Sequence, residues 1–332
     1  KRLPVVSDFM KVDEAGVIEE IEQSVTEATE REIQTNDERD KAHKEMFAKE
    51  PILQIKGLKT YFPLKRNFFG KVTEEVKAVD DVTFDVYPGE TLGLVGESGC
   101  GKTTLGRTVL RLVDPTDGEV IFKGKPLHSM TTDELREIRK DIQIIFQDPY
   151  SSLNPRITVG EAIMEPMTVH KLYANEKERK DKVMELLERV NLLPEHFYRY
   201  PHEFSGGQRQ RICIARALAL RPQFIICDES VSALDVSVQA QVLNLLNELK
   251  RDFDFTYIFI SHDLSVVKFM SDRMVVMNKG VVEEMGDADQ IYSNPKTEYT
   301  KKLIAAIPKG RLEDIEASIN EKEEWQKGVE TV

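Results

Sequence analysis

Nine consecutive residues in the first third of the chain fill a phosphate-binding pattern. The pattern is G-x-x-x-x-G-K-[ST], in which glycines let the backbone fold around phosphates with its N–H groups pointing inward. The lysine of this pattern reaches the β and γ phosphates, and the hydroxyl residue after it can bind Mg²⁺. The stretch predicts a nucleotide site made of Gly96, Glu97, Ser98, Gly99, Cys100, Gly101, Lys102, Thr103 and Thr104.

The residues on either side predict the context that this motif requires. Residues 91–95 form an apolar run of strand length, and residues 105–112 have the apolar spacing of a helix. A strand-to-helix turn places the loop at a helix start, where the helix dipole favours negative charge. A purely structural glycine turn is the alternative, and the flanking strand and helix argue against it.

Polar residues also follow three other strand-like runs. Gln147 ends the run 142–146, Asp228 and Glu229 follow the run 224–227, and His262 follows the run 256–261. Open α/β sheets bind ligands at the carboxyl ends of their strands. Beside a phosphate loop, Asp228 suits Mg²⁺ and Glu229 suits a water molecule. Taken singly, a glutamine or histidine at a strand end is more often structural.

A second glycine pair opens another helix. Ser205-Gly206-Gly207-Gln208 precedes a helical pattern that turns Ile212, Ala215, Leu218 and Ala219 inward. Free N–H groups and the helix dipole make this start an anion site, although the pair alone is a weak signal.

The segment Asn278-Lys279-Gly280 indicates a hairpin turn between two apolar runs. A guanine-specific N-K-x-D motif would need aspartate at position 281, where this chain has Val281. This difference argues against a GTPase.

Composition limits the classes of protein that fit. The chain has 332 residues, 40% hydrophobic and 31% charged, which suits one or two globular domains. Its longest apolar runs fall short of the roughly 18 residues of a membrane span. We see no signal peptide, and Cys100, Cys213 and Cys227 lack metal or disulfide spacing, so we expect free thiols in a reducing cytoplasm.

The acidic charge is concentrated at the ends of the chain. Of the net charge of −12, residues 1–50 carry −6 and residues 309–332 carry −3, which leaves −3 for the middle. A nonspecific nucleic-acid binder needs a basic surface, so nucleic acid is not an expected partner, with a local basic patch left open.

Three segments follow from the pattern along the chain. Residues 1–50 form an acidic, partly helical or disordered extension, with Val17, Ile18, Ile21 and Val25 near helical spacing. Residues 51–308 form the folded cassette. Asn154-Pro155 and Pro166 break the chain in a helical insert at about 151–205, in which residues 176–190 form a helix. Residues 309–332 form an acidic tail.

The first strands of the folded part predict an antiparallel sheet. Residues 52–55 begin it, and Val82, Phe84 and Val86 alternate with polar residues. Between them, residues 61–75 have the composition of a loop, including the pair Phe68-Phe69. Tyr61 or Phe62 is equally able to stack on an adenine ring or to pack in the core.

The order of these motifs resembles the ATP-binding cassette of ABC transporters. The resemblance covers residues 52–308 and includes the phosphate loop, Gln147, Ser205-Gly206-Gly207-Gln208, Asp228-Glu229, Ser232-Ala233-Leu234-Asp235 and His262. It implies an α/β fold of the P-loop NTPase type, with a RecA-like lobe, an antiparallel β subdomain and a helical lobe.

The resemblance also implies a role for each residue. Cassettes pair head to tail, with ATP between the phosphate loop of one and the Ser205 signature and Asp235 of the other. Lys102 and the loop amides hold phosphates, Thr103, Gln147 and Asp228 serve Mg²⁺, Glu229 polarises water, and His262 contacts the γ-phosphate.

Narrower motifs resemble the ATPases of oligopeptide and dipeptide permeases, the F-type subunit most. They lie at residues 146–156, 201–205 and 299–308. The His-Pro-Tyr of that family is here Thr297-Glu298-Tyr299, and a cysteine cluster that binds iron and sulfur in some members is absent. We therefore expect ATP and Mg²⁺ as cofactors and no iron–sulfur cluster.

This resemblance implies a peripheral subunit at the cytoplasmic face of the cell membrane. Its partners would be a second cassette, giving a heterodimer, two transmembrane permease subunits and, indirectly, an extracytoplasmic peptide-binding protein.

A soluble ABC ATPase of DNA repair or of translation is the alternative function. Chromosome-type ATPases insert a long coiled coil between the phosphate loop and the signature, whereas 103 positions separate Lys102 from Ser205 here. Translation factors carry two cassettes in a chain, and this sequence has one. Both comparisons favour the importer.

Overall fold

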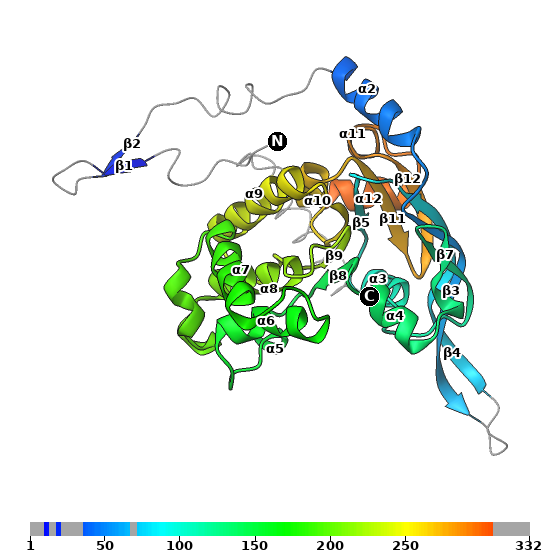
Figure 1. Cartoon of the computed structure of the whole chain (residues 1–332). Helices are drawn as coiled ribbons and strands as arrows, with labels where there is room; N and C mark the ends of the chain where they lie inside the picture. Colours follow the sequence, from blue (N-terminus) through cyan, green and yellow to red (C-terminus); the bar gives the residue numbers. More distant parts are fainter. Residues whose placement is uncertain (1–9, 13–17, 21–35, 67–71, 308–332) are drawn as a thin grey trace, which may run out of the picture.

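The computed structural model describes residues 10–12, 18–20, 36–66 and 72–307 (Figure 1). At its centre is a sheet in the order β12-β11-β5-β10-β9-β8, parallel except for β12. Its strands are β5 (Thr91–Val95), β8 (Ile142–Ile145), β9 (Phe224–Asp228), β10 (Thr256–Ile260), β11 (Arg273–Asn278) and β12 (Val281–Asp287). Every residue of β5, β9 and β10 is buried, which explains their continuous apolar sequences.

Helices follow most of these strands and also form a separate lobe. The α-helices are α2 (Asn36–Phe47), α3 (Lys102–Val109), α4 (Thr132–Ile138), α5 (Pro149–Ser152), α6 (Val159–Val169), α7 (Glu176–Arg189), α8 (Gly206–Leu218), α9 (Val236–Phe253), α10 (Leu264–Met270), α11 (Ala288–Ser293) and α12 (Glu298–Ala305). Short 3₁₀ helices are η2 (Leu127–Ser129), η3 (Pro194–Tyr198) and η4 (Pro201–Glu203). In Figure 1 the green helices α5, α6 and α7 lie together beside α8, and the helical insert predicted at about residues 151–205 overlaps α5 to α7.

Alternate side chains of the central strands enter two separate cores. In β10, Tyr257 and Phe259 pack with the apolar faces of α6 to α11, while Ile258 and Ile260 pack with α3 and the second sheet. The period-two alternation of strand side chains produces this division. Both faces of the sheet are therefore covered, and its ligand-binding positions lie at the strand ends.

The second sheet is antiparallel, as predicted, with the order β4-β3-β6-β7. Its strands are β3 (Leu53–Arg66), β4 (Val72–Val86), β6 (Asp117–Phe122) and β7 (Lys125–Pro126). The loop predicted at residues 61–75 is wrong for residues 61–66 and 72–75, which belong to β3 and β4, and Pro63 pairs with Glu75. Pairing of β3 with β6 ends at Lys59, so Pro63 lies on a free edge that needs no N–H donor. Phe68 and Phe69 lie outside the described residues.

The predicted break at Pro166 is also wrong, because Pro166 lies inside α6. A proline removes one helical hydrogen bond. Here the neighbouring turns are fixed by Ile163 and Met167, which are completely buried in the larger core. Tertiary packing outweighs the local signal. The predicted helix at residues 176–190 is confirmed as α7.

The extension at residues 1–50 contributes a helix that packs on the cassette. In α2, the Phe47 ring meets the Tyr87 ring edge to face at 5.1 Å, and His43 Nδ1 lies 3.4 Å from Asp287 Oδ2. Helical spacing near Ile18 is misleading, since residues 18–20 form a strand, β2 (Ile18–Glu20), paired with β1 (Met10–Val12). Val17, Ile21 and Val25 lie outside the described residues.

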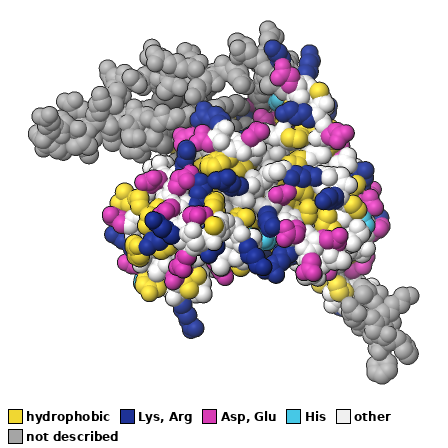
Figure 2. Space-filling model, in the orientation of Figure 1, with side chains coloured by type: hydrophobic (Ala, Val, Ile, Leu, Met, Phe, Trp, Pro, Cys, Tyr) yellow, Lys and Arg dark blue, Asp and Glu magenta, His cyan; other side chains and the backbone are white. Residues whose placement is uncertain are grey.

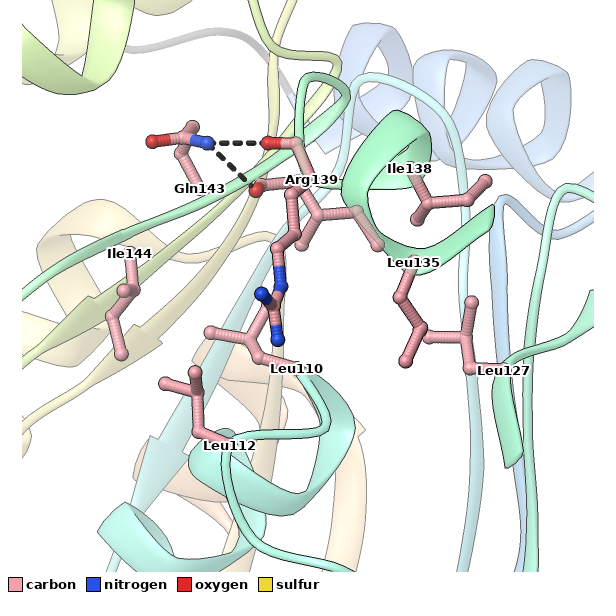
Figure 3. Close-up of a pocket in the computed structure, with 9 residues that line it drawn as sticks. Leu110, Leu112, Leu127, Leu135, Ile138, Arg139, Gln143 and Ile144 are labelled. Atoms are coloured by element: carbon pink, nitrogen blue, oxygen red, sulfur yellow. Dashed lines mark hydrogen bonds between the residues drawn. The ribbon is translucent and has the colours of Figure 1, made fainter. Parts of the chain in front are cut away.

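A small apolar pocket lies at the outer edge of the central sheet. Figure 3 shows Leu110 and Leu112 after α3, Leu135 and Ile138 of α4, and Ile144 of β8 turned toward it, and its volume is about 130 Å³. The Gln143 amide donates to the carbonyls of Arg139 and Ile142 at its rim.

Lys and Arg side chains are interspersed with Asp and Glu on the face shown in Figure 2.

A buried ion pair next to the central sheet also contacts the antiparallel sheet. Glu90, whose side chain is completely buried, accepts from Arg273 Nε at 2.6 Å and from the Tyr87 N–H at 2.8 Å. Arg273 also donates to the carbonyl of Asp85. Burial raises the pKa of Glu90, and the charge of Arg273 opposes that rise.

We expect Arg273→Met to lower the free energy of unfolding by about 3–5 kcal/mol, because it leaves a buried carboxylate without its partner. The pKa of Glu90 in the folded state then rises further above its unfolded value, so the loss is larger at pH 8 than at pH 5. Urea unfolding at both pH values measures it. Lys301→Met, which breaks an exposed pair with Glu298, is the control and should cost less than about 1 kcal/mol. Equal losses for the two variants would contradict this assignment.

Candidate functional site

The glycine-rich loop joins β5 to α3, at the carboxyl end of the central strand. A Cβ on Gly96 would lie 2.2 Å from the carbonyl oxygen of Met277, and one on Gly101 would lie 2.0 Å from that of Ala78. Both glycines have positive φ, at 151° and 109°. Backbone from both sheets therefore presses against the loop, and these two positions exclude any side chain.

The start of α3 leaves hydrogen-bond donors free. Gly101 is its N-cap and provides no side-chain acceptor, so the first N–H groups, of Lys102, Thr103 and Thr104, have no side-chain cap. Ser98 and Gly99 are exposed at the top of the loop. Such an uncapped helix start binds anions. The Cys100 side chain is buried with the second core, and its Sγ lies 3.7 Å from Lys102 Nζ.

Lys102 lies folded over the loop and is almost completely buried. Its Nζ donates to the carbonyl oxygens of Gly96 at 2.8 Å and Glu97 at 2.9 Å. It also contacts Cys100 Sγ at 3.7 Å, so the hydrogen-bond partners given for this buried ammonium are neutral groups. The positive charge of Lys102 therefore lies against the backbone of the loop.

Thr103 and Asp228 meet beneath the same loop. The Thr103 hydroxyl donates to Asp228 Oδ1 at 2.8 Å, and Asp228 is only 3% exposed. Burial raises the pKa of Asp228, while the Thr103 hydrogen bond and the charge of Arg107 oppose the rise. A hydroxyl and a buried carboxylate are hard oxygen donors of the kind that Mg²⁺ takes alongside phosphate oxygens.

Glu229 is the point at which the other strand ends converge. Its Oε2 accepts from Gln147 Nε2 at 3.1 Å and lies 3.4 Å from His262 Nδ1. Its φ is 47°, a conformation that costs energy in a residue with a side chain, and its N–H donates to the carbonyl of Ile260. The structure thus brings together four residues predicted from strand ends, Gln147, Asp228, Glu229 and His262.

The signature residues form a separate helix start. Ser205 caps α8 by accepting from the Gln208 N–H, and Gln208 Oε1 accepts from the Ser205 N–H. Ser205 and Gly206 are exposed, whereas a Cβ on Gly207 would lie 2.3 Å from Val238. A Cβ on Gly206 would lie 3.8 Å from Leu234, and Asp235 occupies the N-cap position of the adjacent α9 without a side-chain capping hydrogen bond. These residues share one surface around α8 and α9.

Tyr61 and Phe62, the two residues considered for adenine, have different surroundings on β3. The Tyr61 hydroxyl donates to Asp80, and Lys77 Nζ lies 5.1 Å from its ring centroid. Phe62 is 42% exposed and pairs with Val76 across the hairpin. The Tyr61 hydroxyl is thus held by a hydrogen bond, whereas the Phe62 ring is partly exposed to solvent. One residue earlier, the Thr60 hydroxyl contacts Thr108 of α3 at 3.0 Å, which joins this strand to the helix after the loop.

Two contacts around the site are not predicted from the sequence. The Arg209 guanidinium lies 3.7 Å from the ring centroid of Tyr150, which joins the signature helix to the segment after Gln147. The Tyr299 hydroxyl of α12 accepts from the Glu97 N–H of the loop at 3.2 Å. More than 200 positions separate Tyr299 from Glu97, and no local pattern indicates such a contact.

The site combines a fixed phosphate loop and a cationic lysine with a buried aspartate and a glutamate at a strand end. These features define a P-loop nucleotide-binding protein. A family model described as "ABC transporter" matches residues 79–232. Residues 79–232 therefore form a domain of this family of ATP-binding cassettes. The resemblance found in the sequence is thereby confirmed.

Several known proteins align with most of this chain. It is 57% identical over 259 residues to "Glutathione import ATP-binding protein GsiA" of Salmonella paratyphi A and 55% identical to the protein of that name from Escherichia coli K12. These alignments cover 78% of this chain and 41% of each relative, so the chain spans less than half the length of these relatives.

Solved structures confirm the predicted fold class. The dimeric post-hydrolysis state of the ATP-binding cassette MJ0796 bound to ADP and Pi has a TM-score of 0.64 and 29% identity, covering 71% of this chain and 98% of that one. CbiO1 of Clostridium perfringens, part of the ABC transporter complex cbiONQ, has a TM-score of 0.64 and 24% identity, covering 82% and 100%. The latter shows the fold alone.

We expect Gly101→Ala to destabilise the protein by about 1–3 kcal/mol through overpacking against the Ala78 carbonyl, in addition to the strain of its φ. Gly99→Ala is the matched control, because Gly99 also has positive φ, at 79°, but a Cβ there meets nothing within 4 Å. Gly99→Ala should lower the free energy of unfolding only by the cost of backbone strain, about 1–2 kcal/mol. Chemical unfolding of the two variants measures the difference. A loss for Gly99→Ala as large as that for Gly101→Ala would show that close packing does not fix the loop.

Proposed function

We propose that this chain is the ATP-hydrolysing subunit that powers import of short peptides by a membrane ABC transporter. The observation that carries the proposal is Glu229, a carboxylate hydrogen-bonded to Gln147 and next to His262, one residue beyond the buried Asp228 and below a phosphate loop. The name of these relatives, glutathione import ATP-binding protein, supports a peptide as the cargo class.

The loop residues hold the triphosphate in this proposal. The N–H groups from Ser98 to Thr104 surround the β and γ phosphates, and Lys102 transfers its ammonium from the loop carbonyls to the phosphate oxygens. Glu229 orients the attacking water, and His262, whose side chain is 55% exposed, approaches the γ-phosphate. Positioning and charge stabilisation supply most of the catalysis in phosphoryl transfer.

Mg²⁺ fits the donor set on the floor of the site. The Thr103 hydroxyl and Asp228 already contact each other, and the Gln147 side chain keeps its carbonyl oxygen for a ligand while its amide nitrogen donates to Glu229. When bound, Mg²⁺ neutralises charge on the phosphate oxygens. This chain's contribution is to hold those three oxygens at one edge of the sheet.

Phe62 is our choice for the adenine contact. Its ring is partly exposed on the hairpin that follows Thr60, whereas Tyr61 is held by Asp80 and Lys77. An aromatic face available to solvent can stack on a base. This choice between two adjacent aromatic residues rests on their hydrogen bonds.

The signature residues act on a second cassette. Ser205, Gly206, Gly207 and Gln208 form an exposed helix start, with Asp235 nearby, and we propose that they close over the ATP of a partner cassette. The MJ0796 cassette is described as dimeric with bound ADP and Pi, which supports pairing. We infer a heterodimer that binds two permease subunits at the cytoplasmic face, with a peptide-binding protein on the other side.

The domain division is part of the same proposal. Residues 51–308 are the cassette, and residues 1–50 and 309–332 are acidic additions to it. Among the described residues, no helix has the length and apolar content needed to cross a membrane. The DNA-repair and translation alternative has no observation in its favour.

We expect Glu229→Gln to keep MgATP affinity while lowering turnover of the assembled complex by about 100-fold or more, since the amide keeps the shape and removes the charge that orients water. Steady-state phosphate release and nucleotide titration measure the two effects. Glu188→Gln, the same change on the exposed face of α7, is the control and should leave both unchanged. Wild-type turnover by Glu229→Gln would refute the role assigned to this carboxylate.

We expect Ser205→Arg to separate binding from turnover. An arginine at this exposed cap puts bulk and charge where the partner's γ-phosphate approaches, so ATP-driven pairing and hydrolysis are lost. The isolated chain should bind ATP within about twofold of the wild type. Titration of the isolated variant is compared with turnover of the complex. Loss of ATP binding by the isolated, folded variant would mean that the signature acts within its own chain.

A further inference from the structure

One peptide group of the phosphate loop is held from both of its sides. The Gly96–Glu97 peptide offers its carbonyl to Lys102 Nζ at 2.8 Å and its N–H to the Tyr299 hydroxyl at 3.2 Å. Its two polar atoms point in opposite directions because the peptide is planar and trans. A cation on the carbonyl also polarises the N–H and strengthens the bond to Tyr299.

Tyr299 is held firmly enough to act as a fixed acceptor. Its ring packs against the larger core together with Leu303 and Ile304 of α12. Burial raises the pKa of its phenol, so the hydroxyl stays neutral at physiological pH and can accept from an N–H. In Figure 1, α12 lies beside β12, at the edge of the central sheet.

Glu284 of β12 anchors the start of this helix. Its carboxylate is 8% exposed and accepts from the N–H of Lys296 at 2.9 Å and of Thr297 at 3.2 Å. Burial opposes its ionisation, but the hydrogen bonds from Lys296, Thr300 and Thr297 outweigh burial and lower its pKa. The same hairpin touches the loop, because the Gly280 N–H donates to the carbonyl of Cys100 at 2.9 Å. The loop and α12 therefore share one support.

We propose that Tyr299 is a positioning residue that keeps the Gly96–Glu97 peptide oriented when Lys102 leaves it for the nucleotide. This inference rests on the proposed function, in which the Lys102 ammonium moves to the phosphates. That move frees the Gly96 carbonyl and, among the residues that the structure describes, leaves the Tyr299 hydroxyl as the side chain hydrogen-bonded to this peptide. The next N–H groups, from Ser98 onward, keep their direction toward the phosphates. The C-terminal helix is thus a functional part of the nucleotide site.

The first test uses the full chain without nucleotide. Tyr299→Phe keeps the ring in the core and removes only the acceptor of the Glu97 N–H. We expect the Glu97 amide to exchange about 2- to 10-fold faster, the range given by loss of one neutral hydrogen bond. Hydrogen–deuterium exchange with residue-level fragmentation measures it. Tyr292→Phe is the matched control, because Tyr292 packs against the same core and its ring contacts Lys268. Exchange in Tyr299→Phe equal to that in the control overturns the proposal.

The second test titrates MgATP into the same proteins. We expect the dissociation constant to rise about 2- to 10-fold in Tyr299→Phe and to stay unchanged in Tyr292→Phe. Faster exchange with unchanged MgATP affinity overturns the positioning role and leaves the proposed function intact. A wild-type chain that binds no MgATP overturns the proposed function itself, and the exchange measurement still shows whether the hydroxyl holds the loop.

Discussion

The phosphate loop has no room for side chains at two of its glycines, because carbonyl groups of two different sheets press against it. Met277 of β11 meets Gly96, and Ala78 of β4 meets Gly101. The Gly280 N–H adds a hydrogen bond to Cys100, and the Asp80 N–H donates to the carbonyl of Gly280. The β11–β12 hairpin therefore joins the antiparallel sheet to the loop. Without this arrangement, the free amides at the start of α3 would not converge on one anion.

The same close packing buries two charged side chains of the site. Lys102 and Asp228 are both buried, yet each contacts neutral groups: the lysine contacts two carbonyls and a thiol, and the aspartate contacts a hydroxyl. Buried charges with only neutral partners are costly, and sites that bind charged ligands accept that cost. In the proposed function, triphosphate and Mg²⁺ supply the opposite charges. The strained φ of Glu229 is a second cost at the same edge of the sheet.

The sequence predicts the central sheet and its strand ends well because those signals are local. Continuous apolar runs predict β5, β9 and β10, and Gln147, Asp228, Glu229 and His262 follow such runs directly. Local signals mislead where tertiary packing decides. Pro166 sits inside α6 because Ile163 and Met167 are buried, and residues 61–66 extend β3 because the edge tolerates Pro63. The Tyr299 contact with Glu97 depends on two elements far apart in the chain, so neither local pattern indicates it.

The most direct test of the account is peptide uptake by the transporter complex that we propose contains this chain. The complex is purified from membranes through this chain and reconstituted in proteoliposomes, with ATP supplied on the cassette side. Accumulation of labelled glutathione or a short peptide is then measured with MgATP and with MgADP. We predict that the complex contains membrane-spanning partners and a second cassette, and that uptake requires MgATP. ATP hydrolysis without peptide uptake, or a purified chain with no membrane-spanning partner, would contradict the account.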